Sequence, residues 1–404
     1  MTEYAPEIAI VGGGLVGLSF AAALKGAGVS VMLIDAAPLA TPPERRAPSR
    51  TGHVLESGVD ARVSAINPSS HDFLCRIGGW PGDDVACAFT RMSVADARGT
   101  GHIEFDAGTA GEDALGYIVP NRAVVAALTA TLQASPIEFR AGTRIDRIAS
   151  SPEGYELVLA DGDVVRCRLL VGADGGNSIV RKACSIRSLS WKYPQEAVVT
   201  TIETAHDHGS MARQWFTSEG PLAFLPLPEA SLSSIVWSST DAGRLLQLDE
   251  SALCAALTRA SEGALGDVLA VDQRFSFPLR QSHAFEYVRA HLALIGDAAH
   301  TIHPLAGQGA NLGIADAEVL AQVLIEADFA GESISDVAIL RRYQRRRRPL
   351  NVATAALMET FARLYNTDLP ALNWFRNAAF RVADSQEILK SALTRAASGR
   401  IGFQ

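Results

Sequence analysis

Three glycine turns, each placed directly after a short apolar run, predict an α/β protein with a Rossmann-like domain. The turns occupy residues 12–17, 174–175 and 296–297. Between the second and third turns, residues 183–290 contain alternating, strand-like runs with proline-rich ends, which suit an antiparallel sheet. The expected architecture is therefore a discontinuous nucleotide-binding domain with an inserted antiparallel β-sheet substrate domain, followed by C-terminal helices.

The first turn has the strand, glycines and helix of a dinucleotide site. An apolar run at 8–11 precedes it and an alanine-rich helix follows. Its glycines permit, in order, a tight turn, the approach of a pyrophosphate and close packing of helix on strand. They are Gly12, Gly14 and Gly17. A second strand at 29–34 ends at Asp35, whose carboxylate suits ribose hydroxyls and disfavours a 2′-phosphate.

The apolar stretch at 8–24 could also be read as a targeting or membrane segment. Acidic Glu3 and Glu7 precede it, whereas no Lys or Arg occurs before Lys25. Three glycines in its middle fit a turn better than a spanning helix. We therefore expect neither a signal peptide nor a membrane span here.

The middle turn repeats the pattern of strand, acidic glycine turn and helix. An apolar run at 169–172 leads to Asp174 and Gly175. The aspartate suits either a cofactor contact or the cap of the helix that follows. Because the turn stands in series with the two others, we favour the cofactor contact.

The third turn pairs an acid with a helix start. The run Leu292–Ile295 ends at Gly296-Asp297, as a buried parallel strand ends at a ligand crevice. Further on, Gly307 and Gly309 leave the backbone bare before a helical pattern that begins near Leu312. The free N–H groups and dipole of that helix favour negative charge, such as the charge on the pyrimidine side of a reduced flavin.

Composition excludes several classes of function. With 404 residues, the chain exceeds what one hydrophobic core usually serves, so at least two subdomains are expected. A formal net charge of −8 argues against bulk nucleic-acid binding. Five cysteines without a C-x-x-C pair indicate a reducing compartment, and the nine histidines lack metal-ligand spacing, so we expect no metal.

Basic residues concentrate towards the C-terminal end. Arginines crowd 341–348 just before Pro349, and apolar side chains recur on one helical face at 372–393. Two interpretations of that face stay open: an interfacial helix that meets anionic lipid or a partner protein, and a final helix packed on the core, which we favour. We expect the arginine cluster at 342–348 to be a solvated helix end.

Together, the three turns resemble the motifs of flavoprotein aromatic hydroxylases. The stretch HTIHPLAGQGANLG at 300–313 is similar in particular to the ubiquinone-biosynthesis hydroxylase family of bacteria and mitochondria. Runs at 60–66 and 115–122 match the same family, although Pro120 stands where the family usually has Glu. The resemblance spans residues 8 to about 393.

The resemblance implies a p-hydroxybenzoate hydroxylase-like fold. Its expected parts are an FAD-binding domain at 1–75, 105–182 and 285–348, a substrate domain at 76–104 and 183–284, and a C-terminal helical segment at 349–404.

The resemblance also implies functional residues. The expected FAD contacts are Gly12, Gly14, Gly17, Asp35, Arg62, Arg122, Asp174, Gly175, Asp297, Gly307, Gly309, Ala310 and Asn311. Either arginine could instead form a solvated salt bridge. The expected wall facing the substrate ring is Phe224, Leu225, Pro226 and Trp237, although strand alternation turns about half of such positions away.

The implied activity is that of an FAD-dependent monooxygenase. NAD(P)H would reduce FAD, O₂ would be held as a flavin C4a-hydroperoxide, and one oxygen would pass to the ring of a polyprenylated phenol in ubiquinone biosynthesis. Pro304 would line the reactive edge of the flavin. His303 would steer a proton there, unless it is simply a hydrogen-bonded structural histidine, which we favour.

Competing functions share the same motifs. A hydroxylase of a small soluble phenol, a flavin-dependent reductase and a non-catalytic flavin-binding scaffold of a biosynthetic complex all remain open. We expect other ubiquinone-biosynthesis proteins as partners and a cytoplasmic location, with peripheral contact to the inner membrane as an open alternative.

Overall fold

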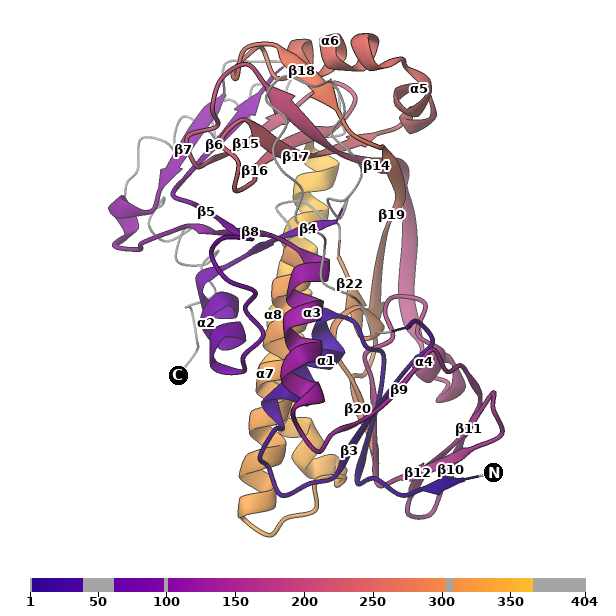
Figure 1. Ribbon diagram of the computed structural model, residues 1–404. Helices are drawn as coiled ribbons and strands as arrows, with labels where there is room; N and C mark the ends of the chain where they lie inside the picture. Colours follow the sequence, from indigo (N-terminus) through magenta and orange to yellow (C-terminus); the bar gives the residue numbers. More distant parts are fainter. Residues whose placement is uncertain (1, 39–61, 98–100, 303–307, 366–404) are drawn as a thin grey trace.

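The computed structural model describes residues 2–38, 62–97, 101–302 and 308–365. Figure 1 shows two main parts, a lower part built on a parallel sheet and an upper part built on an antiparallel sheet. The predicted fold class, a Rossmann-like domain with an inserted antiparallel sheet, is confirmed.

The parallel sheet brings the strands before the three glycine turns together. Its order is β20-β21-β13-β2-β3-β9, in which the last five are parallel and β20 is antiparallel to β21. The strands are β2 (Ile8–Val11), β3 (Val31–Asp35), β9 (Glu138–Ala141), β13 (Leu169–Gly172), β20 (Val288–Arg289) and β21 (Leu292–Leu294). Because β21, β13 and β2 are direct neighbours, their carboxyl ends meet at one edge of the sheet.

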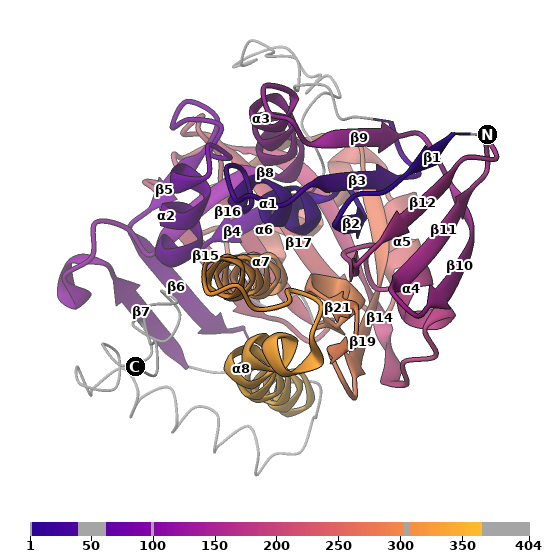
Figure 2. The same ribbon diagram turned by 90° about the horizontal axis from the view of Figure 1, so that it is seen from below.

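Helices cover the parallel sheet and form its hydrophobic core. They are α1 (Leu15–Ala23), α2 (Pro68–Arg76), α3 (Asn121–Gln133), α4 (Ile179–Ala183), α7 (Gln308–Phe329) and α8 (Val337–Tyr365). The core includes Phe20 of α1, Leu33 of β3 and Leu320 of α7, all essentially inaccessible to water. Figure 2 shows α7 and α8 packed side by side beneath the sheet.

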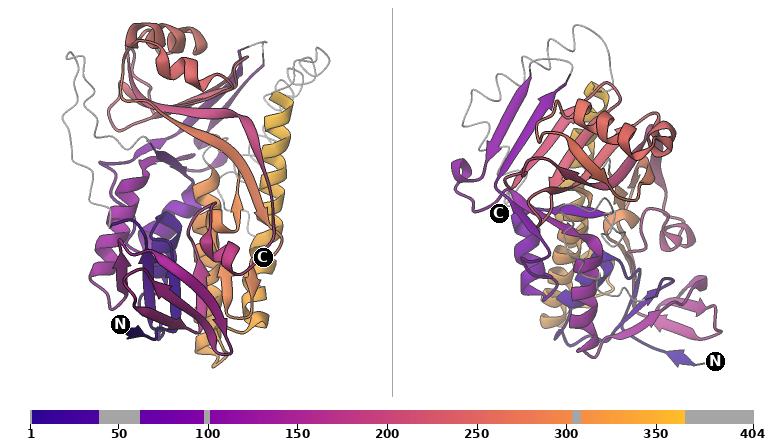
Figure 3. Two further views of the ribbon diagram at one scale, coloured as in Figure 1. Left: turned by 90° about the vertical axis from the view of Figure 1, so that its right-hand side faces the viewer. Right: turned by 45° about the horizontal axis from the view of Figure 1, so that its top comes forward.

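The antiparallel sheet has nine strands among the described residues, ordered β22-β19-β14-β17-β16-β15-β6-β7, with β18 also paired to β14. One neighbouring pair in it, β15 and β6, is parallel. Its strands are β6 (Arg91–Asp96), β7 (His102–Asp106), β14 (Ser188–Thr204), β15 (Met211–Phe216), β16 (Pro221–Pro226), β17 (Leu232–Ser239), β18 (Val268–Val271), β19 (Phe275–Ala284) and β22 (His300–Thr301). Helices α5 (Ala242–Gln247) and α6 (Glu250–Ala260) pack against one face. The long strands β14 and β19 run down beside α8 to the lower part (Figure 3).

Two smaller sheets complete the molecule. One joins β4 (Val63–Ile66), β8 (Gly116–Pro120) and β5 (Cys87–Phe89) between the main parts. The other joins β1 (Glu3–Tyr4), β12 (Val164–Cys167), β11 (Gly154–Leu159) and β10 (Ile145–Ser151) beside the parallel sheet, and sequence reasoning did not anticipate it. Short 3₁₀ turns lie at Gly108–Ala110 and Gly296–Ala298.

Two of the expected domain boundaries need correction. The boundary at 104/105 falls inside β7, which pairs with β6 along its length. The boundary at 348/349 falls inside α8, which continues through Pro349. A proline removes one helical hydrogen bond, but here Tyr343 and Asn351 on either side of it are completely buried, so packing holds the helix together.

Among the described helices, none combines the length and the apolar composition that crossing a bilayer requires. The apolar stretch at 8–24 forms β2, a turn and α1, as its glycines predict. Residues 372–393, whose helical pattern raised the question of a lipid or partner contact, lie outside the described residues.

Candidate active site

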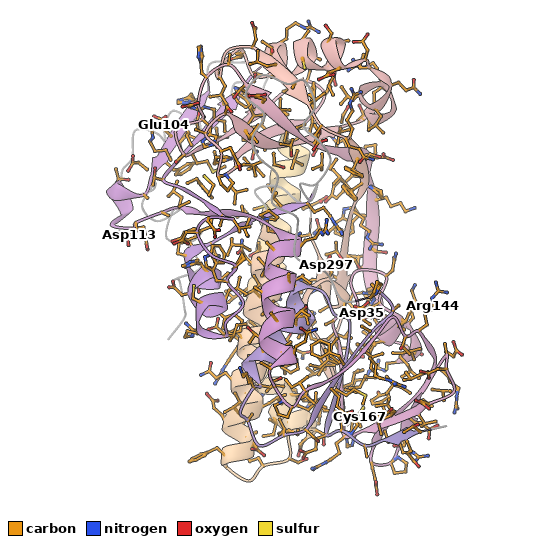
Figure 4. All side chains as sticks on the ribbon, viewed as in Figure 1. Asp35, Glu104, Asp113, Arg144, Cys167 and Asp297 are labelled. Carbon is orange, nitrogen blue, oxygen red and sulfur yellow. The ribbon has the colours of Figure 1, made fainter. Side chains whose placement is uncertain are left out.

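The three glycine turns meet at the carboxyl edge of the parallel sheet. In register, Gly172 of β13 stands beside Val11 of β2 on one side and Leu294 of β21 on the other. The three turns begin one or two residues after these strands end. Figure 4 shows Asp35 and Asp297 at this end of the sheet.

The first turn has the geometry that its glycines predict. Gly12 has φ +113°, and a Cβ there would stand 2.3 Å from the carbonyl oxygen of Ala173. A Cβ on Gly17 would stand 1.9 Å from the carbonyl oxygen of Gly12, so the helix packs directly on the turn. At Gly14, a Cβ would meet nothing within 4 Å among the described residues. The turn therefore leaves backbone amides at the start of α1 facing open space, which fits an anionic pyrophosphate.

Asp35 holds the first turn as well as the end of β3. Its carboxylate accepts hydrogen bonds from the backbone N–H of Gly13 and from that of Ala37, the latter at 2.6 Å. A carboxylate so fixed points at the glycine turn, where a bound adenosine ribose would lie in this kind of site. The ribose contact itself stays a prediction.

Asp174 caps α4 and leaves one carboxylate oxygen for a cofactor contact, which stays a prediction. Its Oδ2 accepts from the backbone N–H of Ile179 at 2.6 Å and of Val180 at 3.2 Å, so it caps α4. The capping role that we set aside is therefore real. The buried Oδ1 finds no hydrogen-bond partner among the described residues, and burial raises the pKa of the carboxyl. An orphaned buried oxygen at this edge fits a hydroxyl-bearing ligand such as a flavin ribityl chain.

Arg181, which sequence reasoning missed, connects the second and third turns through hydrogen bonds. The side chain is buried, and its guanidinium donates to the carbonyl oxygens of Ala298 and Gly176, both at 2.7 Å. The sequence gives one weak signal for it, a cation seven residues after Asp174 on a short helix. One of its two partners, the carbonyl of Ala298, lies 117 residues further along the chain, which no local pattern reveals.

The third turn places its acid at the surface. Gly296 has φ +58°, and the side chain of Asp297 is accessible to water. Surrounding protein raises the pKa of this carboxyl by desolvation, while His300 and Arg280 act in the opposite direction. The site residues His303, Pro304 and Gly307 lie outside the described residues.

Asn311, an expected FAD contact, has a side chain that is hydrogen-bonded to the backbone of residues 65 and 67. The amide oxygen accepts from the backbone N–H of Asn67 at 2.9 Å, and the amide nitrogen donates to the carbonyl of Ala65 at 2.8 Å. The side chain therefore ties α7 to the junction of β4 and α2. A backbone contact to the cofactor from this helix start, including Gly309 and Ala310, stays a proposal.

The two expected arginine contacts lie on the elements that join the halves. Arg62, just before β4, is exposed, with its guanidinium 5.8 Å from the ring centroid of Phe277. Arg122 is exposed in the first turn of α3. Neither position decides between a cofactor contact and an ion pair, so both stay predictions.

Most of the expected substrate wall faces away from the flavin half. Phe224 and Trp237, only 1% and 4% exposed, pack in the core beneath α5 and α6. Pro226 follows the same alternation and is buried. The prediction that these three line the substrate ring is therefore wrong. Leu225 lies on the opposite face, against the cluster that contains Ile118 of β8.

The opposite face of the antiparallel sheet carries mainly uncharged side chains, and the charged residues that strand register places on it are the acids Asp96 and Glu203. Strand register places the following residues on the same face as Leu225: Ala197, Val199, Gln214, Ala223, Ser234, Val236 and Phe277. Arg213 turns to the other face, where it donates to the backbone carbonyl of His208 at 3.0 Å. This face, on which strand register places no Lys or Arg of the described residues, looks towards β4, which Asn311 joins to α7.

The arginine cluster at 342–348 is only partly solvated. Arg342 is exposed and pairs with Glu332 through two hydrogen bonds of 2.7 and 2.8 Å. Arg347 is instead buried and donates to Asp316 of α7 at 2.8 Å. The prediction of a solvated helix end is therefore wrong for Arg347, because α8 turns that side chain onto α7.

Comparison with known proteins agrees with this geometry. The family described as "FAD binding domain" matches residues 6–360. Among solved structures, p-nitrophenol 4-monooxygenase PnpA from Pseudomonas putida DLL-E4 superposes with a TM-score of 0.78 at 20% identity, covering 100% of both chains. PqsL from Pseudomonas aeruginosa, a probable FAD-dependent monooxygenase, gives 0.75 at 24% identity, covering 94% of this chain and 100% of the other. The protein thus has an FAD-binding domain and the fold of the FAD-dependent aromatic hydroxylases.

Relatives with higher sequence identity show which family of flavin-dependent hydroxylases the chain belongs to. The chain is 35% identical over 403 residues to 3-demethoxyubiquinol 3-hydroxylase of Escherichia coli (strain K12), covering 99% of this chain and 100% of the relative. It is 34% identical to mitochondrial ubiquinone biosynthesis monooxygenase COQ6 of Homo sapiens, covering 98% and 93%. Ubiquinone hydroxylase UbiL of Rhodospirillum rubrum is also 34% identical, covering 98% and 90%. The chain belongs to the ubiquinone-biosynthesis hydroxylase family of FAD-dependent monooxygenases.

Proposed function

We propose that this protein hydroxylates the aromatic ring of a polyprenylated phenol in ubiquinone biosynthesis, with NAD(P)H and O₂ as co-substrates. The names of its relatives point to that pathway. The observation that carries the substrate class is the face of the antiparallel sheet that contains Leu225, because strand register places none of the described Lys or Arg residues on it. On this face Ala223, Val236 and Val199 stand side by side in register, and Phe277 lies in the next row beside Ala197. A phenolic acid would need a buried cation there to offset the cost of desolvating its carboxylate.

Bound FAD supplies the redox chemistry, in which NAD(P)H and O₂ yield a ring hydroxyl group, water and NAD(P)⁺. The protein positions the reactants. The glycine turn at 12–17 and the start of α1 hold the pyrophosphate, and Asp174 offers its unpaired oxygen to the ribityl chain. The start of α7 directs backbone N–H groups at the pyrimidine side of the ring. The face of the antiparallel sheet that contains Leu225 receives the phenol and keeps water from the reacting atoms.

His303 and Pro304 lie outside the described residues, and their roles rest on the family motif alone. Pro304 would line the reactive edge of the flavin, and His303 would move a proton there. We expect His303→Ala to retain FAD but to lower the yield of hydroxylated product per NAD(P)H oxidised. An unchanged yield would mean that the histidine is structural.

Substrate selection tests the proposed function. The purified, FAD-loaded protein is assayed for NAD(P)H oxidation and product with a short-chain prenylated phenol and, as a matched comparison, with 4-hydroxybenzoate. We expect stimulated oxidation and a hydroxylated product only with the prenylated phenol. Turnover of the benzoate alone would favour the hydroxylase of a small soluble phenol. Retained FAD without turnover of either compound would favour the non-catalytic scaffold.

We further propose that the protein works at the cytoplasmic side of the inner membrane, together with other proteins of the pathway. A polyprenyl chain partitions into lipid, so the enzyme must take its substrate from a membrane or from a partner that carries it. Flotation with anionic vesicles that contain a prenylated phenol, compared with neutral vesicles, separates membrane contact from delivery by a partner.

A further inference from the structure

We propose that Asp316 is a positioning residue for FAD, because it locks the third glycine turn to α7, α8 and β22. Asp316 lies in the middle of α7 and is completely buried. It touches neither the first turn nor the antiparallel sheet, and the family motif that we quoted for 300–313 ends before it. The proposal concerns the flavin half alone and does not depend on the substrate.

Asp316 collects hydrogen bonds from four other groups. Its Oδ2 accepts from the backbone N–H of Gly296 at 3.1 Å and from Nε2 of His300 at 2.5 Å. Its Oδ1 accepts from Nε of Arg347 at 2.8 Å and from the amide of Asn351 at 3.0 Å. Each carboxylate oxygen thus has two donors, which fills the hydrogen-bonding capacity of the group.

The carboxyl stays ionised in this setting. Burial alone would raise its pKa, but His300 and Arg347 more than offset that effect and hold the pKa at about 2. An ionised acceptor requires the proton of the imidazole to sit on Nε2 of His300. The cluster therefore combines a buried carboxylate, a buried guanidinium and an imidazole of fixed tautomer.

The four donors come from three parts of the flavin half. Gly296 starts the third turn, His300 begins β22, and Arg347 and Asn351 lie one turn apart on α8. Arg347 also donates to the carbonyl of Leu312 in the first turns of α7, at 3.3 Å. One carboxylate therefore fixes the distance between the Gly296-Asp297 turn and the start of α7.

Close packing makes the distance between the Gly296-Asp297 turn and the start of α7 sensitive to small displacements. A Cβ on Gly313 of α7 would stand 2.5 Å from Cγ2 of Val16 and 3.4 Å from Cα of Gly296, so helix, turn and α1 are in contact. A shift of the turn by a fraction of an ångström would move Asp297 relative to the backbone amides at the start of α7. Both are expected flavin contacts, so we infer that Asp316 sets their spacing without touching the cofactor.

The test separates positioning from stability. Removing one member of a buried ion pair leaves an unpaired charge, whereas replacing both members by apolar side chains is often tolerated. We therefore compare Asp316→Leu with the double variant Asp316→Leu/Arg347→Leu. Asp96→Leu serves as the control, because Asp96 is a buried acid on β6 of the antiparallel sheet.

Two measurements are made on each variant: the dissociation constant of FAD by flavin fluorescence, and amide hydrogen exchange of the 292–302 segment in the apoprotein. We expect the single variant to be unstable and the double variant to fold. The double variant should bind FAD at least about tenfold more weakly, and its 292–302 segment should exchange at least about tenfold faster. Asp96→Leu should change neither quantity, even where it lowers the melting temperature.

Two outcomes would overturn the proposal. A folded double variant with the wild-type dissociation constant and exchange rate would show that the cluster does not position the turn. A double variant that fails to fold would show that the cluster is needed for the fold in general. As an independent check, Arg347→Lys keeps the charge but loses the geometry of the guanidinium. It should fold and weaken FAD binding by a smaller factor than the double variant.

Discussion

The parallel sheet with its glycine turns and the antiparallel sheet above it contribute to the site in different ways. In the flavin half, backbone atoms at strand ends form the site, and glycines are required where a Cβ would collide, as at Gly12 and Gly17. In the upper half, side chains on one face of the sheet form the site, and the residue type alone does not decide the face. Phe224 and Leu225 are adjacent in sequence yet point in opposite directions.

This difference between a backbone site and a side-chain site explains which parts of the active site can be predicted from a short stretch of sequence. A backbone site needs particular residues at fixed spacing, so its signature is short and specific. A sheet face needs only apolar or neutral residues at every second position, and both faces of this sheet meet that condition because both are covered. Substitutions in the glycine turns and on each face of the antiparallel sheet test this comparison directly.

The largest effect is expected in the first glycine turn. Gly17→Ala would place a methyl group 1.9 Å from the carbonyl oxygen of Gly12, so the turn and α1 must separate. We expect a loss of at least about 4 kcal/mol in the free energy of unfolding, and no FAD binding. Gly14→Ala is the matched control, because its Cβ meets open space at an allowed φ of −79°. It should melt like the wild-type apoprotein and yet bind FAD more weakly, and equal melting of both variants would contradict the account.

The next largest effects should distinguish the roles of the two faces of the antiparallel sheet. Phe224→Ala removes a fully buried ring from the core under α5 and α6 and should cost about 3 to 5 kcal/mol of stability. Its KM for a prenylated phenol should stay near the wild-type value. Leu225→Ala should cost less stability and raise KM. Denaturant unfolding and steady-state kinetics on both variants measure the split, and a raised KM for Phe224→Ala alone would reverse the assignment of the faces.

A pH effect is expected where the two halves join. His283 of β19 pairs in register with His300, and desolvation, with smaller effects of His300 and Arg348, lowers its pKa to about 4. The unfolded chain takes up the proton near pH 6.5 while the folded protein does not, so stability falls as pH drops from about 6.5 to 4. Allowing for its partial exposure, we expect a loss of roughly 2 to 3 kcal/mol from this residue.

The measurement for His283 is the free energy of unfolding as a function of pH in the wild type and in His283→Gln. Burial also lowers the pKa of His208, so part of the pH dependence remains in the variant. The difference between the two curves isolates His283. Parallel curves between pH 4 and 6.5 would show that the imidazole titrates normally in the folded protein.

The smallest effect concerns the exposed ion pair of the arginine cluster. Arg342→Met breaks the pair with Glu332 at the surface, where solvent screens the charges. We expect no measurable change in melting temperature. Arg347→Met, in the same cluster, removes the guanidinium that neutralises the buried carboxylate of Asp316 and should lower the melting temperature strongly. Equal changes in melting temperature for the two variants would contradict the distinction between a solvated Arg342 and a buried Arg347.

Sequence reasoning recovered what local chemistry determines. The strand, turn and helix order around Gly12 and Asp35 follows from spacing and side-chain type, as does the adjacency of the three turns. It missed partners that lie far apart in the chain, such as Arg181 with Ala298 and Asp316 with Arg347. It also misassigned Phe224 and Trp237, because alternation fixes only relative direction.

Oxygen transfer tests the central claim most directly. The FAD-loaded protein is supplied with NAD(P)H, a short-chain prenylated phenol and ¹⁸O₂, and the product is analysed by mass spectrometry. The account predicts one ¹⁸O atom in the new ring hydroxyl group and close to one NAD(P)H consumed for each product. A product without ¹⁸O, or NAD(P)H oxidation that forms no hydroxylated ring, would contradict the assignment of this protein as a ring hydroxylase.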